Sequence, residues 1–281
     1  MLKSKYKQAK KKVTQISDHF EYYLYDLFKR EDLFKSVEKY CMFVGYTRSG
    51  HSLVGSLLDA HPNIIIGHEL NALKLFEQGF SCQKIYYLLL QNSRRKANAG
   101  RQETGYFYRV PDQCQGKFQT IKVIGDKRGS ATNFIIRTNP KILQVLPNRL
   151  DVPIKFIHVV RNPYDNITTM IARKKADLEY GINSYFTKCK TVAYLKTQID
   201  RQDILDIRHE SLIDDPKAIL SQLCEFLEVE TNQKYLNDCA SVVFKSPKKT
   251  RFTYQWDQRA IDLVKSQIEQ YNFLQGYSYD D

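Results

Sequence analysis

The sequence has no apolar run long enough to cross a membrane. No stretch approaches the roughly 20 apolar residues that a spanning helix needs, and the longest runs, such as residues 86–90, are core-sized. No apolar region precedes Val13 in the way that a signal peptide requires. We therefore expect a cytoplasmic chain with neither a leader nor a transmembrane segment.

Cysteine patterns typical of metal sites are also missing. The six cysteines form no C-x-x-C pair, and none stands at metal-like spacing to a histidine. We expect free thiols in a reducing compartment and no bound metal.

Acidic residues are too few to balance the basic ones. The chain of 281 residues has 43 Lys and Arg against 31 Asp and Glu, a net charge of +12. Residues 1–12 hold six lysines and no acid, so half of the excess lies on one short segment. Such a balance indicates an anionic partner: a nucleic acid, a membrane surface or a polyanionic small ligand.

Residues 1–40 have the pattern of a basic amphipathic helix. Apolar residues recur there at three- and four-residue steps, among them Val13, Ile16, Phe20 and Leu24. We expect this arm to pack on the domain or to pair two subunits in a homodimer. A membrane-surface helix is the alternative.

The rest of the chain, 41–281, alternates short apolar strands with helical segments. Strands are predicted at 41–44, 64–66, 120–125, 155–160 and 204–208, and helices at 52–60, 82–98, 214–227 and 257–270. This order predicts a single α/β domain with a P-loop-like parallel sheet flanked by helices. Ligands of such folds bind at the carboxyl ends of the strands.

The loop after the first predicted strand suits a bound phosphate. It runs from Gly45 to Ser52 and fits G-x-x-x-x-G-K-[ST] except that His51 replaces the lysine. Backbone amides at Ser49, Gly50 and Ser52 can hold an anion, and Arg48 can supply the cation that a neutral histidine does not.

A second anion loop follows the strand 155–160. Arg161 stands at the strand end, and Thr169 lies eight residues on, where its hydroxyl can share a phosphate with Arg161. A magnesium-dependent nucleoside triphosphatase would want an Asp at this strand end. Two anion loops and no such Asp favour a metal-free ligand with two separated phosphates.

These motifs together resemble the sulfotransferase superfamily. The resemblance rests on 44–53, on Leu57–Asn63 and on 160–163 with Thr169. It implies that the donor is 3′-phosphoadenosine 5′-phosphosulfate, that the first loop holds the 5′-phosphosulfate, and that Arg161 and Thr169 hold the 3′-phosphate. The product would be adenosine 3′,5′-bisphosphate.

The protein-tyrosine sulfotransferase branch resembles this sequence further. That likeness implies that Glu69 is the general base and that Lys127, with Arg48, stabilises the transition state. His68 and His51 are the alternative bases. His68 and Asn71 are expected beside the acceptor, although Asn71 stands where that branch has an arginine. A late basic loop in the family closes over the 3′-phosphate, which implies Ser246, Lys249 and Arg251 here.

We therefore predict a sulfotransferase that acts on a hydroxyl or amine of a small molecule, such as an alkaloid-like secondary metabolite. A P-loop small-molecule kinase is the first alternative, and a protein or carbohydrate sulfotransferase the second. A nucleic-acid binder would leave both anion loops unexplained, so we expect no nucleic-acid partner.

Overall fold

The computed structural model describes residues 33–103 and 105–281. Most of the expected helical arm, with its proposed role in a homodimer, lies outside the described residues. The end of that arm was wrongly expected to be helical, because residues 33–36 form a turn and β1 (Lys39–Gly45) begins soon after. Phe34 and Val37 are buried in the core.

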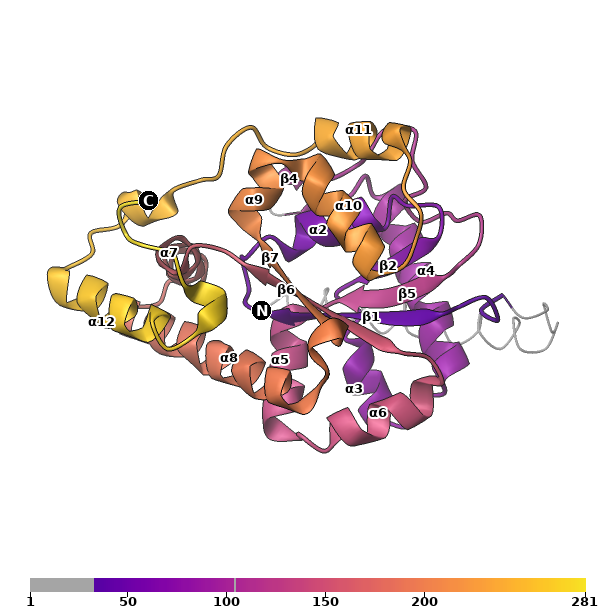
Figure 1. Ribbon diagram of the computed structural model, residues 1–281, viewed down its shortest axis with the longest axis horizontal. Coiled ribbons are helices and arrows are strands. Elements are labelled where there is room, and N and C mark those ends of the chain that lie inside the picture. Colours follow the sequence, from indigo (N-terminus) through magenta and orange to yellow (C-terminus); the bar gives the residue numbers. More distant parts are fainter. Residues whose placement is uncertain (1–32, 104) are drawn as a thin grey trace, which may run out of the picture.

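Five parallel strands form the sheet in the order β2-β5-β1-β6-β7 (Figure 1). They are β1, β2 (Ile64–His68), β5 (Val123–Lys127), β6 (Ile154–Val160) and β7 (Ile204–Arg208). The predicted parallel α/β fold is thus confirmed. Two short strands, β3 (Gln102–Glu103) and β4 (Tyr106–Phe107), pair separately as an antiparallel hairpin.

The strands β2 and β5 both extend further into polar sequence than expected. β5 was predicted to end at Gly125, yet Asp126 pairs with Gly67 and Lys127 with His68. Parallel pairing and helices on both faces keep these polar residues in a buried strand. As a result, Lys127 ends a strand rather than occupying a loop.

The helices connect the strands in the expected alternating order. The predicted helix 82–98 is confirmed as α4 (Cys82–Asn98), whose cap Ser81 accepts a hydrogen bond from Lys84 N. The others are α2 (His51–Leu58), α3 (Ala72–Glu77), α5 (Gly129–Thr138), α6 (Ile142–Leu150), α7 (Pro163–Lys174), α8 (Leu178–Gln198), α9 (His209–Asp214), α10 (Pro216–Phe226), α11 (Gln233–Ser241) and α12 (Gln258–Ile268), with short 3-10 turns η1 (Arg201–Asp203), η2 (Thr250–Thr253) and η3 (Asn272–Leu274).

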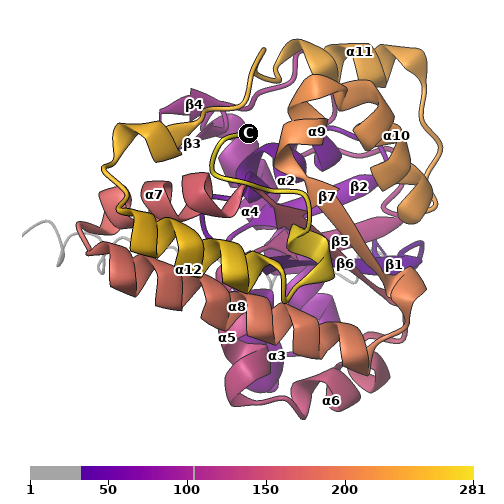
Figure 2. The ribbon, with the colours of Figure 1, turned by 60° about the vertical axis from the view of Figure 1, so that its left-hand side comes forward.

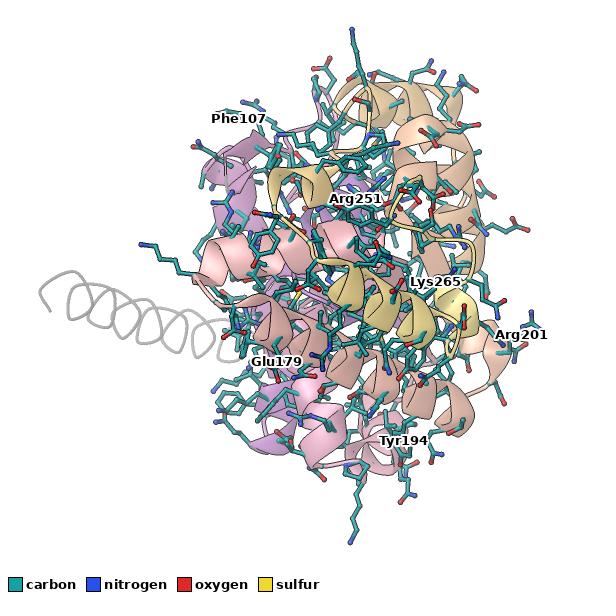
Figure 3. All side chains as sticks on the ribbon, turned by 90° about the vertical axis from the view of Figure 1, so that its left-hand side faces the viewer. Phe107, Glu179, Tyr194, Arg201, Arg251 and Lys265 are labelled. Carbon is teal, nitrogen blue, oxygen red and sulfur yellow. The ribbon has the colours of Figure 1, made fainter. Side chains whose placement is uncertain are left out.

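The helices cover both faces of the sheet and add a third layer at one end. In Figure 1, α2, α9, α10 and α11 lie on one side of the sheet and α3, α5 and α6 on the other. In Figure 2, α7, α8 and α12 lie side by side, and their apolar faces form a separate buried cluster. Arg251, from η2, lies beside this layer (Figure 3). No helix among the described residues has both the length and the apolar character to span a bilayer.

Candidate active site

A cavity of about 860 Å³ opens at the carboxyl ends of the strands. Each of the five parallel strands leads into it. β1 continues into the first loop (Tyr46–Gly50), β5 ends in Lys127, and Glu69, Arg161 and His209 follow β2, β6 and β7. Because the sheet is parallel, residues far apart in the sequence converge at one edge.

The first loop has the backbone of an anion cradle. Arg48 has a φ of 72°, and Gly50, which begins α2, has a φ of 106°. Ser49 does not line the cavity, because its hydroxyl is buried and donates to Tyr46 O at 3.2 Å. The first amides of α2 have no partner inside the helix, so those of His51 and Ser52 are available to an anion.

His51 lines this cavity as a neutral imidazole. Its Nε2 lies 3.1 Å from the carbonyl oxygen of Val44, which only accepts, so Nε2 carries the proton. Burial, reinforced by nearby Lys127, lowers the pKa of His51 to about 3. The residue therefore does not replace the cation of a P-loop lysine.

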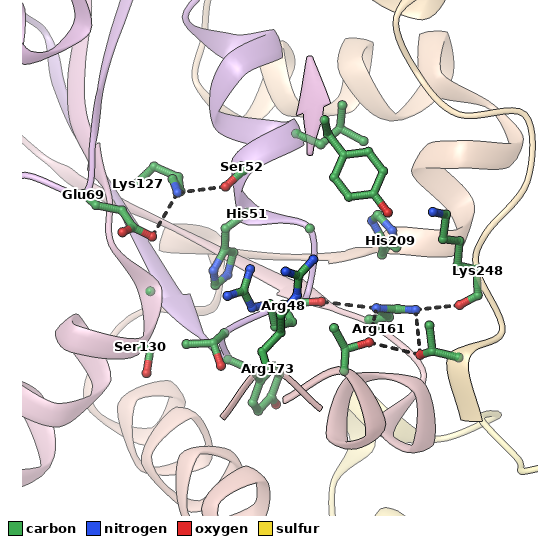
Figure 4. Close-up of a pocket in the computed structure, with 18 of the residues that line it drawn as sticks. Arg48, His51, Ser52, Glu69, Lys127, Ser130, Arg161, Arg173, His209 and Lys248 are labelled. Carbon is green, nitrogen blue, oxygen red and sulfur yellow. Dashed lines mark hydrogen bonds and ion pairs between the residues drawn. The ribbon is translucent and has the colours of Figure 1, made fainter. Parts of the chain in front are cut away.

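Lys127 supplies that cation from the neighbouring strand. Its Nζ donates to Ser52 Oγ at 3.0 Å and to Glu69 Oε1 at 3.2 Å, and it lies 3.4 Å from Nε2 of His68. Figure 4 shows the contacts of Lys127 with Ser52 and Glu69 at one end of the cavity. A single ammonium group thus links the first turn of α2 to the predicted base.

Glu69 is a half-exposed carboxylate between two cations. Besides Lys127, it accepts a hydrogen bond from Arg128 Nη1 at 2.8 Å. Burial raises the pKa of Glu69, but Lys127 and Arg128 together outweigh it, so the pKa lies below its usual 4.5. Glu69 is ionised at neutral pH and can accept a proton.

Asp126 holds the turn that carries Glu69. Its buried carboxylate accepts hydrogen bonds from Leu70 N at 3.1 Å and Ala72 N at 2.8 Å. Asn71 begins α3 within this turn at a φ of 67° and does not line the cavity. His68 is likewise buried behind Lys127 rather than part of the lining.

The opposite end of the cavity is organised by Arg161. Its guanidinium donates to Thr169 Oγ1 at 3.2 Å, to Thr250 Oγ1 at 3.3 Å and to the carbonyl of Lys248 (Figure 4). Only 7% of Arg161 is exposed, and burial lowers its pKa. None of the described carboxylates forms an ion pair with Arg161, and Asp165 and Glu210 act on its charge only from beyond ion-pair distance. Its guanidinium therefore remains available to an anion in the cavity.

The late basic loop contributes residues other than the expected ones. Ser246 and Lys249 are exposed away from the cavity. Arg251 points into the protein, where its Nη1 lies 2.6 Å from Asp165 Oδ2. Lys248 and Thr250 line the cavity instead, together with Thr253, which lies one 3-10 turn after Thr250 and therefore on the same side.

His209 is a lining residue that the sequence analysis did not identify. The structure places it in the lining, against Gly50, with a buried Nδ1 that has no partner among the described residues. Burial, reinforced by Arg161, lowers the pKa of His209 to about 3. The one feature of the sequence that could have indicated this role is that His209 directly follows a predicted strand.

Cations dominate the completed lining. Glu69 is the one carboxylate among the lining residues, against six basic side chains: Arg48, Lys127, Arg128, Arg161, Arg173 and Lys248. Aromatic rings form another part of the wall, where Tyr106 and Tyr108 pack against Phe244. The arrangement suits a polyanion with an aromatic or apolar portion.

A family model described as "Sulfotransferase family" matches residues 42–233. The chain belongs to the sulfotransferase family. The matched segment includes both anion loops, Glu69 and Lys127.

Individual relatives are distant. Protein-tyrosine sulfotransferase 1 of Danio rerio is 25% identical over 206 residues, which is 69% of this chain and 54% of that protein. Protein-tyrosine sulfotransferase A of Caenorhabditis elegans is 22% identical over 223 residues, 74% and 55% of the two chains. The chain spans about half the length of the curated relatives it matches.

Solved structures resemble the fold at low identity. Sulfotransferase STF9 from Mycobacterium avium is 10% identical with a TM-score of 0.49, covering 88% of this chain and 80% of its own. The sulfotransferase domain of the Synechococcus PCC 7002 olefin synthase is 18% identical with a TM-score of 0.47, covering 82% and 88%. In this sulfotransferase, no group of three His, Cys, Asp or Glu among the described residues could hold a metal ion.

Proposed function

We propose that this sulfotransferase moves a sulfuryl group from 3′-phosphoadenosine 5′-phosphosulfate to a hydroxyl or amine of a small molecule. The observation that carries the proposal is Arg161, a buried cation in no ion pair with a described carboxylate, at the far end of the cavity from Glu69 and Lys127. A donor that carries a phosphate on each side of its nucleoside would fit this cavity, because one phosphate would contact Arg161 and the other Lys127.

The residues of the cavity fit such a donor. Arg161, Thr169 and Thr250 would hold the 3′-phosphate. The amides of the first loop, with Arg48 and Lys127, would hold the 5′-phosphosulfate, and the orphaned Nδ1 of His209 is available to a donor group between them. When bound, the donor supplies the sulfuryl group on a phosphate leaving group.

The chain's own residues would then align and ionise the acceptor. Glu69 takes the proton of the attacking hydroxyl or amine, which a positioned base accelerates by about 10²–10⁴-fold. Lys127 lies between Glu69 and Ser52 at the start of α2, where its charge stabilises negative charge that develops near the first loop. Asp126 keeps Glu69 in place through the turn amides.

A small acceptor is supported by the cavity itself. It is a concave space bounded by Tyr106, Tyr108, Phe134 and Phe244, which suits a compact organic molecule. The named relatives are protein-tyrosine sulfotransferases, so a tyrosine in a protein is the alternative acceptor. We infer a tailoring role on a secondary metabolite in the cytoplasm, which the six free thiols support.

Thermal unfolding with two ligands tests the donor. Adenosine 3′,5′-bisphosphate should raise the melting temperature, because a ligand at 100 times its Kd adds about 2.7 kcal/mol to the free energy of unfolding. ATP with magnesium should shift it less. The reverse order would favour the kinase alternative. A screen of hydroxyl and amine acceptors for a sulfated product by mass spectrometry then identifies the acceptor class.

A further inference from the structure

A second cavity adjoins the catalytic end of the first. It has a volume of about 390 Å³ and shares two lining residues, Ser130 and Phe134, with the large cavity. Its other lining residues come from α5, α7 and α8, and Figure 2 shows these helices adjacent to one another. A molecule that extends beyond Arg128 and Phe134 therefore enters this second space.

The lining of the second cavity is cationic. Among its described lining residues are Arg137, Lys174 and Lys188, and none is a carboxylate. Their contacts within the described part of the chain are with neutral groups. Lys188 Nζ donates to Ser184 O at 2.7 Å, Lys174 Nζ donates to Tyr180 Oη at 2.6 Å, and Arg137 lies over the ring of Phe134.

The three cations also affect one another. The pKa of Lys188 falls to about 8, first because the side chain is buried and then because Lys174 and Arg137 are close. Two acids stand at the start of α8, and neither lines the cavity: Asp177, the helix cap, accepts a hydrogen bond from Tyr180 N at 2.7 Å, and Glu179 lies in the first turn. An anion bound in the cavity would reduce the repulsion among these three cations.

We propose that the second cavity binds an anionic group of the acceptor, so that the substrate class is a small molecule with a nucleophilic hydroxyl or amine at one end and a carboxylate, phosphate or sulfate at the other. This proposal rests on the proposed function. Glu69 faces the nucleophile, Phe134, which is 57% exposed, borders the connecting portion, and Arg137, Lys174 and Lys188 meet the anion.

The test uses protein saturated with adenosine 3′,5′-bisphosphate, which fills the donor site. Calorimetry measures the binding of hydroxylated aromatic carboxylates of increasing length, beginning with para-hydroxybenzoate, each against its own primary amide. At least one carboxylate should bind about 10-fold or more tightly than its amide, which is the size of a charge-assisted hydrogen bond. If every carboxylate binds no better than its amide, the proposal is overturned.

Two variants test whether the carboxylate binds at Lys188 or is attracted only by the net positive charge of the protein. Lys188→Met should remove most of the preference for the carboxylate and leave the amide unchanged within about 2-fold. Lys190→Met, at an exposed position on the same helix and outside the lining, should change neither. Equal losses in both variants, or for both ligands, would contradict the proposal.

The same experiment distinguishes its two possible failures. If the bisphosphate itself does not bind, the proposed function fails. If the bisphosphate binds and the carboxylates show no preference, only this inference fails. Inorganic phosphate serves as the free-anion arm: if it binds as tightly as the best carboxylate and does so in place of it, the cavity takes a free anion rather than part of the acceptor, and the substrate-class proposal is wrong.

Discussion

At the scale of single residues, the partner of each buried arginine decides what else the arginine can bind. Arg101 pairs with Asp59 and Arg251 with Asp165, so both charges are neutralised within the protein. Arg161 contacts hydroxyl and carbonyl oxygens instead. A guanidinium held by neutral acceptors keeps its full charge for a ligand.

We therefore predict that Arg161→Gln weakens the binding of adenosine 3′,5′-bisphosphate by about 10–100-fold, as expected for a lost charge-assisted bond. Adenosine 5′-phosphosulfate, which lacks the 3′-phosphate, should lose much less. Lys249→Gln is the matched control, since Lys249 is exposed in the adjoining loop. Calorimetric titration of both ligands measures the difference, and equal losses would place Arg161 away from the 3′-phosphate.

Glu69→Gln should preserve the fold and donor binding while kcat falls by about 10²–10⁴-fold, since the change keeps the shape and removes the basic group. The two cations that lower the pKa of Glu69 below 4.5 fix the sign of the pH effect. The wild-type rate should rise with pH to a plateau reached below about pH 5, and the variant should lack that rise. A variant with near-normal kcat would transfer the role to another base, with His68 next to be tested.

At the scale of elements, the first loop depends on glycine for two separate reasons. Gly50 has a φ of 106°, which disfavours any side chain, and a Cβ there would lie 2.4 Å from Nδ1 of His209. Gly79 also has a positive φ, of 86°, but a Cβ there would meet nothing within 4 Å. A side chain at either glycine would strain the backbone, but only a side chain at Gly50 would also clash with a neighbouring residue.

Gly79→Ala should therefore cost about 1 kcal/mol of stability through backbone strain alone and leave bisphosphate binding intact. Gly50→Ala should cost more and also weaken the bisphosphate, because either the loop or His209 must move. Chemical denaturation and calorimetry of the two variants separate these effects. If Gly50→Ala binds the bisphosphate as wild type does, the loop is not the anion cradle.

The elements also show how far sequence reasoning reached. Apolar runs predicted all five strands of the main sheet, and the glycine spacing located the first loop, because both signals are local. Which residues of the late basic loop line the cavity could not be predicted. Lys248 faces the cavity and Lys249 faces solvent, while Arg251 is drawn inward by Asp165, 86 residues away along the chain.

Helix α5 was missed for a similar reason. Its sequence, with Gly129 at the start and Thr and Asn within it, has weak helical propensity. Tertiary contacts stabilise it instead: Asn133 accepts a hydrogen bond from Gly45 N and donates to Lys188 O. The sequence therefore did not predict that Arg128 and Phe134 line the cavity near Glu69.

At the scale of the whole molecule, the C-terminal segment is tied to the Arg161 end of the cavity. Asp165 in α7 accepts hydrogen bonds from Arg251 N at 2.8 Å and from its Nη1 at 2.6 Å, and Arg251 Nε donates to Tyr279 O at 2.6 Å. One buried ion pair thus joins α7, the η2 turn and the last residues of the chain. The same turn presents Thr250 to Arg161.

Arg251→Met should consequently destabilise the protein by about 3–5 kcal/mol, because it leaves the buried Asp165 charge without its partner. Bisphosphate binding should weaken as well, although Arg251 does not line the cavity, since Thr250 and Lys248 would lose their support. The double variant Asp165→Asn with Arg251→Met should recover part of the stability by removing the orphaned charge. Denaturation curves with and without the bisphosphate measure both effects. If Arg251→Met matches the stability of the exposed control Lys249→Met, the ion pair does not hold the C-terminal segment in place.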